Sequence, residues 1–173
     1  MTVSNADYLK QFFEDTKTAG AKIVSSDFTF EVAGHESTYL LCKQAPWPEL
    51  SPAGEIEIPT PMGGTMFQPQ QIKTAHQGSI SMMETVAGSV DRMLLELITS
   101  GGNYANGGAT FDATIYEGTP QKYLRAKKLR DCFLQLDNPD RDWDQRSEVL
   151  VLSGTLFFHY FGEVIAGNSS DYR

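Results

Sequence analysis

The sequence predicts a mainly β fold: an antiparallel β-sandwich or partly closed barrel with one packed amphipathic helix, a long Pro-rich loop and an N-terminal helix. Two observations support this class. Six or seven segments rich in Val, Leu, Thr, Phe and Tyr alternate with a period of two, as strands do. The last of them, Ser147–Phe161, is largely apolar on both faces. We therefore expect the core to cover one side of this strand, and a helix or another subunit to cover the other.

Length and composition limit the class of protein. One domain over residues 1–173 is expected, because a chain of this length supplies one sizeable core. No apolar run is long enough to cross a membrane and no signal peptide precedes the domain, so we expect a cytoplasmic product without a membrane anchor. Cys42 and Cys132 lie in apolar strand patterns and are predicted to be buried free thiols. The net charge of −8 argues against a protein that grips nucleic acid through its phosphates.

The N-terminal segment, residues 1–20, contains a predicted helix over Ser4–Gly20, with Ser4 as the N-cap. Tyr8, Phe12 and Phe13 form a narrow apolar stripe on it. Two partners are open for this stripe: the protein's own body and a neighbouring subunit.

The β core is predicted to occupy residues 22–44 and 77–161, beginning with a hairpin. Phe28, Phe30 and Val32 alternate with polar residues, and Ser37–Gln44 returns as a second strand after the turn Ala33–Glu36.

The segment 45–71 holds six of the eight prolines, so we expect an extended loop with little regular structure beyond Glu55–Ile58. It is nevertheless too apolar for a solvated linker. Two interpretations stay open: a loop packed on its own barrel, or an arm that packs against another subunit. The apolar residues that would make such a subunit contact are Trp47, Ile56, Ile58, Met62, Met66 and Phe67.

The second part of the core continues with a strand at Gln77–Val86 and a helix over residues 89–99. Ser89 is the expected N-cap, and Gly101 and Gly102 are expected to end the helix. Strands at Thr110–Glu117 and Lys122–Leu136 follow. The helix carries one continuous apolar stripe, Val90, Met93, Leu94, Leu97 and Ile98. The long strand is predicted to place Leu124, Ala126, Cys132, Leu134 and Leu136 on one face, and it carries a basic patch of Arg125, Lys127, Lys128 and Arg130.

No motif typical of an enzyme or a cofactor site occurs in the sequence: there is no Walker A pattern, dinucleotide-binding fingerprint, nucleophile elbow or H-E-x-x-H. Asp140, Asp142 and Asp144 resemble the start of a calcium loop, but the Gly and Glu that such a loop requires are missing. We therefore favour an exposed acidic connection anchored by Trp143. A non-enzymatic protein without cofactor or metal is expected.

The order of these elements resembles that of the tail tube proteins of contractile-tail bacteriophages, which share their fold with the Hcp tube proteins of type VI secretion. The resemblance covers Phe28–Phe161. Its most specific part is the C-terminal block, in which Phe111–Tyr116 leads to a long strand ending in Arg130–Phe133, and Asp142–Asp144 leads to Glu148–Tyr160.

This resemblance implies a structural protein of a virion tail, made in the host bacterial cytoplasm. It implies hexameric rings of identical subunits stacked into a hollow tube, with tail sheath, baseplate and tail terminator proteins as partners and with DNA passing through the lumen without specific binding. Rings need a heterologous interface, to which Val149, Val151 and Phe157 would add. An acidic lumen would repel phosphate, and the candidates to line it are Asp27, Glu31, Asp112 and Glu117.

Two alternatives to a phage tail tube stay open. One is a monomeric β-barrel that binds a small ligand, with the Pro-rich loop as its lid. The other is an Hcp-like tube of a secretion system.

Overall fold

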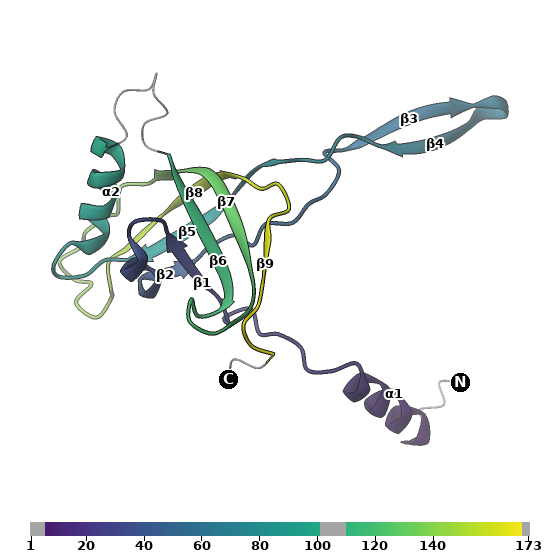
Figure 1. The fold of residues 1–173 in the computed structure, drawn as a ribbon, viewed down its shortest axis with the longest axis horizontal. Coiled ribbons are helices and arrows are strands. Elements are labelled where there is room, and N and C mark those ends of the chain that lie inside the picture. Colours follow the sequence, from purple (N-terminus) through teal and green to yellow (C-terminus); the bar gives the residue numbers. More distant parts are fainter. Residues whose placement is uncertain (1–5, 101–109, 171–173) are drawn as a thin grey trace.

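The computed structural model describes residues 6–100 and 110–170, and its main part is a curled, antiparallel seven-stranded sheet (Figure 1). The order is β1-β6-β7-β8-β5-β2, and β9 pairs with β7. The mainly β class expected from the sequence is confirmed. The strands of this sheet are β1 (Thr29–Val32), β2 (Cys42–Gln44), β5 (Ala75–Met83), β6 (Phe111–Gly118), β7 (Tyr123–Leu136), β8 (Val151–His159) and β9 (Val164–Ala166).

Strand β7 joins the two halves of the sheet. It pairs with β6 along most of its length, with β9 at residues 125–127 and with β8 at residues 130–136. The β7–β8 register shifts between Arg130 and Phe133, where Asp131 adopts a left-handed φ of 44°. This bulge reverses which side chains point inward. Leu129 is therefore buried on one side of it and Cys132 on the other, so the single inward face predicted for Leu124–Leu136 is wrong.

The core lies between the two halves of the sheet and one helix, α2 (Ser89–Ser100). Phe30, Ile80 and Leu156 are fully buried there, and α2 adds Val90 and Met93. Each fully buried side chain of this size contributes roughly 1.5–3 kcal/mol. The core therefore accounts for the stability of the body.

Both cysteines are free thiols, as the sequence predicted. Cys132 is buried and Cys42 is half-buried. Burial raises the pKa of both thiols to about 12. Neither forms an appreciable thiolate at neutral pH, so both are poorly reactive.

The predicted pairing of the first two strands is wrong. β1 pairs with β6, whereas β2 pairs with β5 on the other edge of the sheet. Glu36–Leu40 form a 3₁₀ turn, so residues 37–40 do not belong to the second strand as expected. The final strand is also shorter than the expected Ser147–Phe161, since β8 spans nine residues, and β9 was not predicted.

The Pro-rich segment also differs from its prediction, because it contains a regular β-hairpin. Strands β3 (Glu55–Thr60) and β4 (Gly64–Pro69) pair in an unbroken register from Glu55↔Pro69 to Thr60↔Gly64. Proline is compatible with this hairpin because both strands are edges, so a missing N–H need not interrupt a ladder. At the tip, Met62 and Gly63 both have positive φ.

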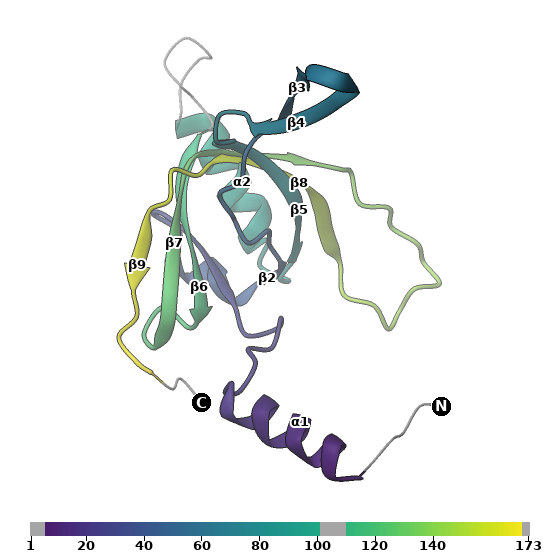
Figure 2. The ribbon, with the colours of Figure 1, turned by 90° about the vertical axis from the view of Figure 1, so that its right-hand side faces the viewer.

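The N-terminal helix is present as α1 (Ala6–Thr18), and the proposed N-cap Ser4 lies outside the described residues. No residue of α1 is buried. Figures 1 and 2 show it lying below the body, away from the β3–β4 hairpin at the top, while in Figure 1 both extend toward the same side. Of the two partners considered for its apolar stripe, the protein's own body is therefore not contacted. Among the described residues, no helix has the length and apolarity needed to span a membrane.

Helix α2 is capped by a side chain that the sequence did not identify. Glu84 accepts hydrogen bonds from the backbone amides of Val90 (3.0 Å) and Asp91 (2.9 Å), while Ser89 contacts Thr85 instead of acting alone as the N-cap. Burial alone would raise the pKa of Glu84, but the amides that donate to it lower it on balance. The predicted C-terminal glycines, Gly101 and Gly102, lie outside the described residues.

Replacing Glu84 with Gln is expected to destabilise the protein by about 1 kcal/mol at pH 7, since a charged cap at a helix N-terminus is lost. Because the folded-state pKa is below the ordinary value of 4.5, this contribution is present above pH 4.5 and fades as the pH falls through the folded pKa. Urea denaturation of both proteins at pH 7 and pH 3.5 measures it. Glu148→Gln, at an exposed carboxylate outside any helix, is the control. An equal difference at both pH values would contradict the prediction.

Candidate assembly surfaces

The β3–β4 hairpin, called the arm below (Glu55–Pro69), is an isolated two-stranded ribbon that extends away from the body (Figures 1 and 2). The register places Ile56, Ile58 and Met66 on one face, because Ile58 pairs with Met66. Phe67 lies on the other face opposite Glu57, and Met62 is fully exposed at the tip. The arm therefore carries five of the six apolar residues predicted to contact another subunit.

Such a ribbon is at best marginally stable in water unless a third strand or a helix packs against it. Within residues 6–100 and 110–170 the arm has no such cover, and its apolar side chains other than the half-buried Ile58 are exposed. It projects away from the body, so it does not close an opening of the barrel as a lid would. This geometry fits the interpretation of the Pro-rich segment as an arm that packs against another subunit better than the interpretation as a loop packed on its own barrel.

The base of the arm is fixed to the body by Lys127 of β7, whose side chain is 8% exposed. Its Nζ donates to the Pro48 carbonyl (2.6 Å) and to Glu49 Oε1 (2.8 Å), and lies 4.8 Å from the centre of the Trp47 ring. Trp47 Nε1 also donates to Glu49 Oε1 (3.0 Å). A buried ammonium group requires such partners. Trp47, the sixth predicted contact residue, is thus half-buried over Lys127.

This cluster, called the anchor below (Trp47, Pro48, Glu49, Lys127), also shifts a pKa. The hydrogen bond from Lys127 is the largest influence on Glu49 and lowers the pKa of its carboxyl. Next to the anchor, Pro46 passes so close to β5 that a Cβ added at Gly78 would lie 2.3 Å from the Pro46 Cβ. The chain is therefore held tightly where it leaves the body toward the arm.

The predicted basic patch on β7 is mostly used within the protein. Arg125 forms a two-point ion pair with Glu117, whose side chain is largely buried. Arg130 contacts both Asp112 (2.9 Å) and Glu163 (2.8 Å). These pairs raise the pKa of Arg125 and Arg130. Lys127 belongs to the anchor, and the fourth member of the patch, Lys128, is exposed. Three of the four basic residues are therefore engaged by carboxylates of the same chain, which argues against a basic binding surface.

The four carboxylates expected to face a lumen lie in different surroundings. Asp112 and Glu117 are paired with arginines of β7. Glu31 lies on β1 beside Tyr116, whose hydroxyl donates to it at 3.4 Å, and Asp27 is half-buried just before β1. All four thus lie at the β1–β6–β7 side of the body.

The other predicted contact residues lie on or just before β8. Phe157 stacks on Phe133 of β7, with ring centroids 4.8 Å apart, and Val149 is exposed. Val151 is half-buried at the start of β8. These residues are not part of the arm, so the sequence pointed to two separate apolar surfaces.

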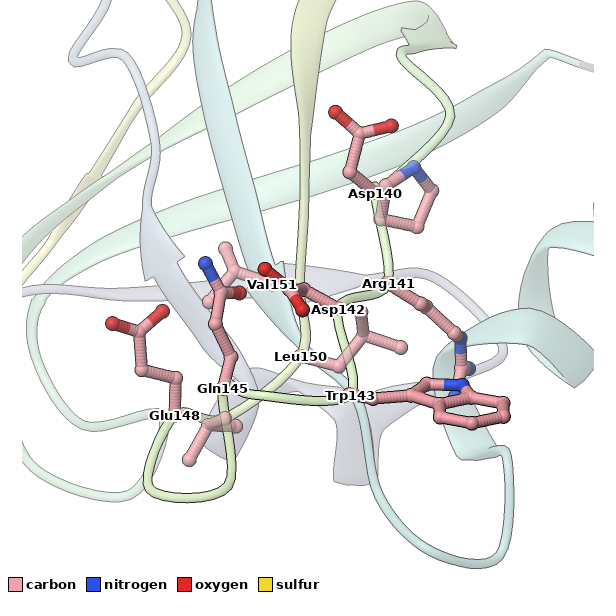
Figure 3. A pocket seen from close by; sticks show the side chains of 10 residues that line it. Asp140, Arg141, Asp142, Trp143, Gln145, Glu148, Leu150 and Val151 are labelled. Carbon is pink, nitrogen blue, oxygen red and sulfur yellow. The ribbon is translucent and has the colours of Figure 1, made fainter.

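The acidic connection, which joins the end of β7 to the start of β8, itself lines a pocket of about 570 Å³ (Figure 3). Trp143 is 92% exposed, so the prediction that it anchors this connection is wrong. Figure 3 shows Asp140 and Glu148 on opposite sides of the pocket. Among the described residues, no group of three His, Cys, Asp or Glu side chains is arranged to hold a metal ion. The exposed connection favoured from the sequence fits this arrangement better than a calcium loop.

The fold is shared with solved components of contractile injection systems. A chain of the PVC sheath–tube complex of an extracellular contractile injection system, in the extended state, matches with a TM-score of 0.57 and 16% identity over 88% of this chain and 97% of that chain. The tube-terminating cap of the anti-feeding prophage matches with a TM-score of 0.57 and 17% identity over 85% and 93%. The PVC sheath/tube terminator matches with a TM-score of 0.55 and 18% identity over 84% and 96%.

No protein-family model and no curated protein matches the sequence. The likeness is therefore one of fold, and the structural resemblance expected from the order of elements is confirmed at that level.

The anchor was missed by the sequence analysis, although one signal for it existed. Lys127 is two residues from the buried Leu129, so the strand period places its side chain inward. An inward lysine requires a nearby acceptor. Nothing in the sequence identified the Pro48 carbonyl and Glu49 as that acceptor, because they lie 79 and 78 residues away.

Replacing Lys127 with Met is expected to release the base of the arm, because the Pro48 carbonyl loses its donor and Trp47 loses its cation. In a Trp143→Phe background the remaining tryptophan is Trp47, so its fluorescence emission should shift to longer wavelength as the ring becomes solvated. The lost buried hydrogen bond should also lower stability by roughly 1–3 kcal/mol.

The matched control for Lys127→Met is Lys128→Met, which removes the same charge from an exposed neighbour. Unchanged Trp47 emission in Lys127→Met would show that the anchor does not hold the ring.

Proposed function

We propose that this protein is a structural, non-catalytic subunit of the tube of a contractile injection system or contractile tail, which assembles as rings stacked into a hollow conduit. The single observation that carries the proposal is the arm: a regular hairpin with exposed apolar faces and no intramolecular cover. The fold shared with sheath–tube, cap and terminator components supports it. Sheath, baseplate and terminator proteins of the same particle are the proposed partners.

The finer proposal is that identical subunits meet through a heterologous interface. One patch is the arm, and Val149, Val151 and Phe157 belong to the facing patch of the neighbouring copy. A heterologous contact suits rings because each subunit offers different surfaces on its two sides. A tail tube that conducts DNA and a secretion-system tube are both consistent with this assembly.

Removing the arm tests the proposal. The amide of Gln70 donates to the Gly54 carbonyl at 2.9 Å, so deleting Glu55–Pro69 joins two residues that are already close. The variant is expected to keep a folded body with the same circular dichroism, because no core residue is removed. It should no longer form rings or tubes in negative-stain electron micrographs at concentrations where the complete protein does.

A surface control accompanies the deletion: Trp143→Ser removes another exposed aromatic side chain and should leave assembly intact. Tubes formed equally well by the protein lacking Glu55–Pro69 would remove the main support for the proposed function. A complete protein that stays a 19.2 kDa monomer at high concentration would contradict it directly.

We also propose that carboxylates on the β1–β6–β7 side, Asp27, Glu31, Asp112 and Glu117, face the lumen. Asp112 and Glu117 are paired with arginines, so their contribution to the repulsion is reduced. A negatively charged lumen wall repels phosphate groups, so DNA passes without binding.

Reversing these charges is expected to make the conduit retain DNA. Assembled tubes carrying Asp27→Lys and Glu31→Lys should bind short DNA duplexes at low salt and release them as the salt is raised, since binding releases counterions. Fluorescence anisotropy of labelled DNA measures this, with Asp140→Lys and Asp144→Lys in the exposed acidic connection as a charge-matched control. Equal retention by the control and the double variant would exclude the lumen assignment.

A further inference from the structure

The N-terminal helix has an apolar face that no other described part of its own chain covers. Tyr8, Leu9, Phe12 and Phe13 are each more than half exposed, and the Tyr8 and Phe12 rings contact each other edge to face at 4.6 Å. An isolated helix of 13 residues is marginal in water. The aromatic face therefore indicates that α1 becomes stable by packing on another surface.

The arm, in turn, lacks a helix packed on its apolar face. A two-stranded ribbon becomes stable when a helix packs on its apolar face, and the arm offers Ile56, Ile58 and Met66 on one such face. Each of the two projecting elements thus lacks the kind of partner that the other provides.

In Figures 1 and 2 the arm leaves the upper part of the body and α1 lies below the body, and in Figure 1 both extend toward the same side. Residues 19–28 lead from α1 into β1, whereas the arm leaves the body between β2 and β5. In this arrangement α1 and the arm of one chain do not meet. Copies stacked along this vertical direction would bring α1 of one copy toward the arm of the next.

The two elements offer only a local charge pairing, because α1 carries three acidic residues against two lysines. The arm carries Glu55 and Glu57 and no basic residue. On α1, Lys10 and Lys17 lie seven residues apart and so share one side of the helix. At about 100° per residue this side borders Phe13, at the edge of the aromatic face. Glu55 and Glu57 lie on the other face of the ribbon, so lysines of a helix on the Ile56–Ile58 face reach them only around the edge of β3.

We propose that α1 of one copy packs its aromatic face on the Ile56, Ile58 and Met66 face of the arm of the next copy. The contact is heterologous and repeats from copy to copy, as the axial growth of a tube requires. It rests on the proposed function only in that copies must stack. It gives α1 a packing partner, which the body of its own chain does not offer.

Disulfide trapping between two different variants tests the contact. One preparation carries Phe12→Cys and the other Met66→Cys, each in the complete chain. The native Cys42 and Cys132 are poorly reactive, because burial raises the pKa of each to about 12. After mixing, assembly and mild oxidation, a covalent dimer containing both variants is expected on a non-reducing gel. Mass spectrometry of the linked peptides then shows whether the bond joins the two introduced cysteines, one from each chain.

The matched control replaces Phe12→Cys with Glu14→Cys, on the opposite side of the same helix. It should give at least about tenfold less mixed dimer. Equal trapping by both helix positions, or dimers only within each preparation, would overturn the proposal.

Electron microscopy of the same mixtures separates this proposal from the proposed function. Tubes without the mixed disulfide would overturn the helix–arm contact and leave the tube function standing. A mixed disulfide in assemblies that are not tubes would support the contact and contradict the function. If neither disulfides nor assemblies form, both are rejected.

Discussion

The buried ammonium group of Lys127 is the interaction on which the relation between body and arm depends. A buried charge is tolerated only where donors and acceptors are matched, and here the Pro48 carbonyl, Glu49 and the Trp47 ring supply the match. All three lie on the short segment that leads into the arm. The requirement to satisfy one lysine of the central strand therefore fixes the position at which an otherwise unsupported hairpin leaves the body.

The remaining charges of β7 follow the same principle. Arg125 and Arg130 pair with carboxylates of β6 and of the segment before β9, so cations that look like a binding patch in the sequence are used inside the fold. Copies of a chain with a net charge of −8 repel one another. Contacts between copies must then come chiefly from apolar surfaces, with local charge pairs aiding their register. Salt, which screens repulsion beyond about 8–10 Å, favours such contacts.

Local patterns predicted some elements well and failed where distant residues decide. The stripe of Val90, Met93 and Leu97 was sufficient for α2, because helical periodicity is a local property. The pairing of β1 with β6 was not accessible, since the partners lie far apart in the sequence, as Thr29 and Tyr116 do. The hairpin of the arm was not predicted because prolines usually exclude regular strands. Proline is tolerated here because both strands are edge strands, which the sequence does not reveal.

The body and the projecting elements divide the apolar residues into two sets with different roles. Phe30, Leu129 and Leu156 bury their surface within one chain, so the body has a complete core without a partner. The apolar faces of α1 and the arm are absent from that core. Substitutions on these faces remove no core contact, so under the proposed assembly they act on association while leaving folding intact. Folding before assembly is then possible, since the surfaces proposed to join copies are not those that hold one copy together.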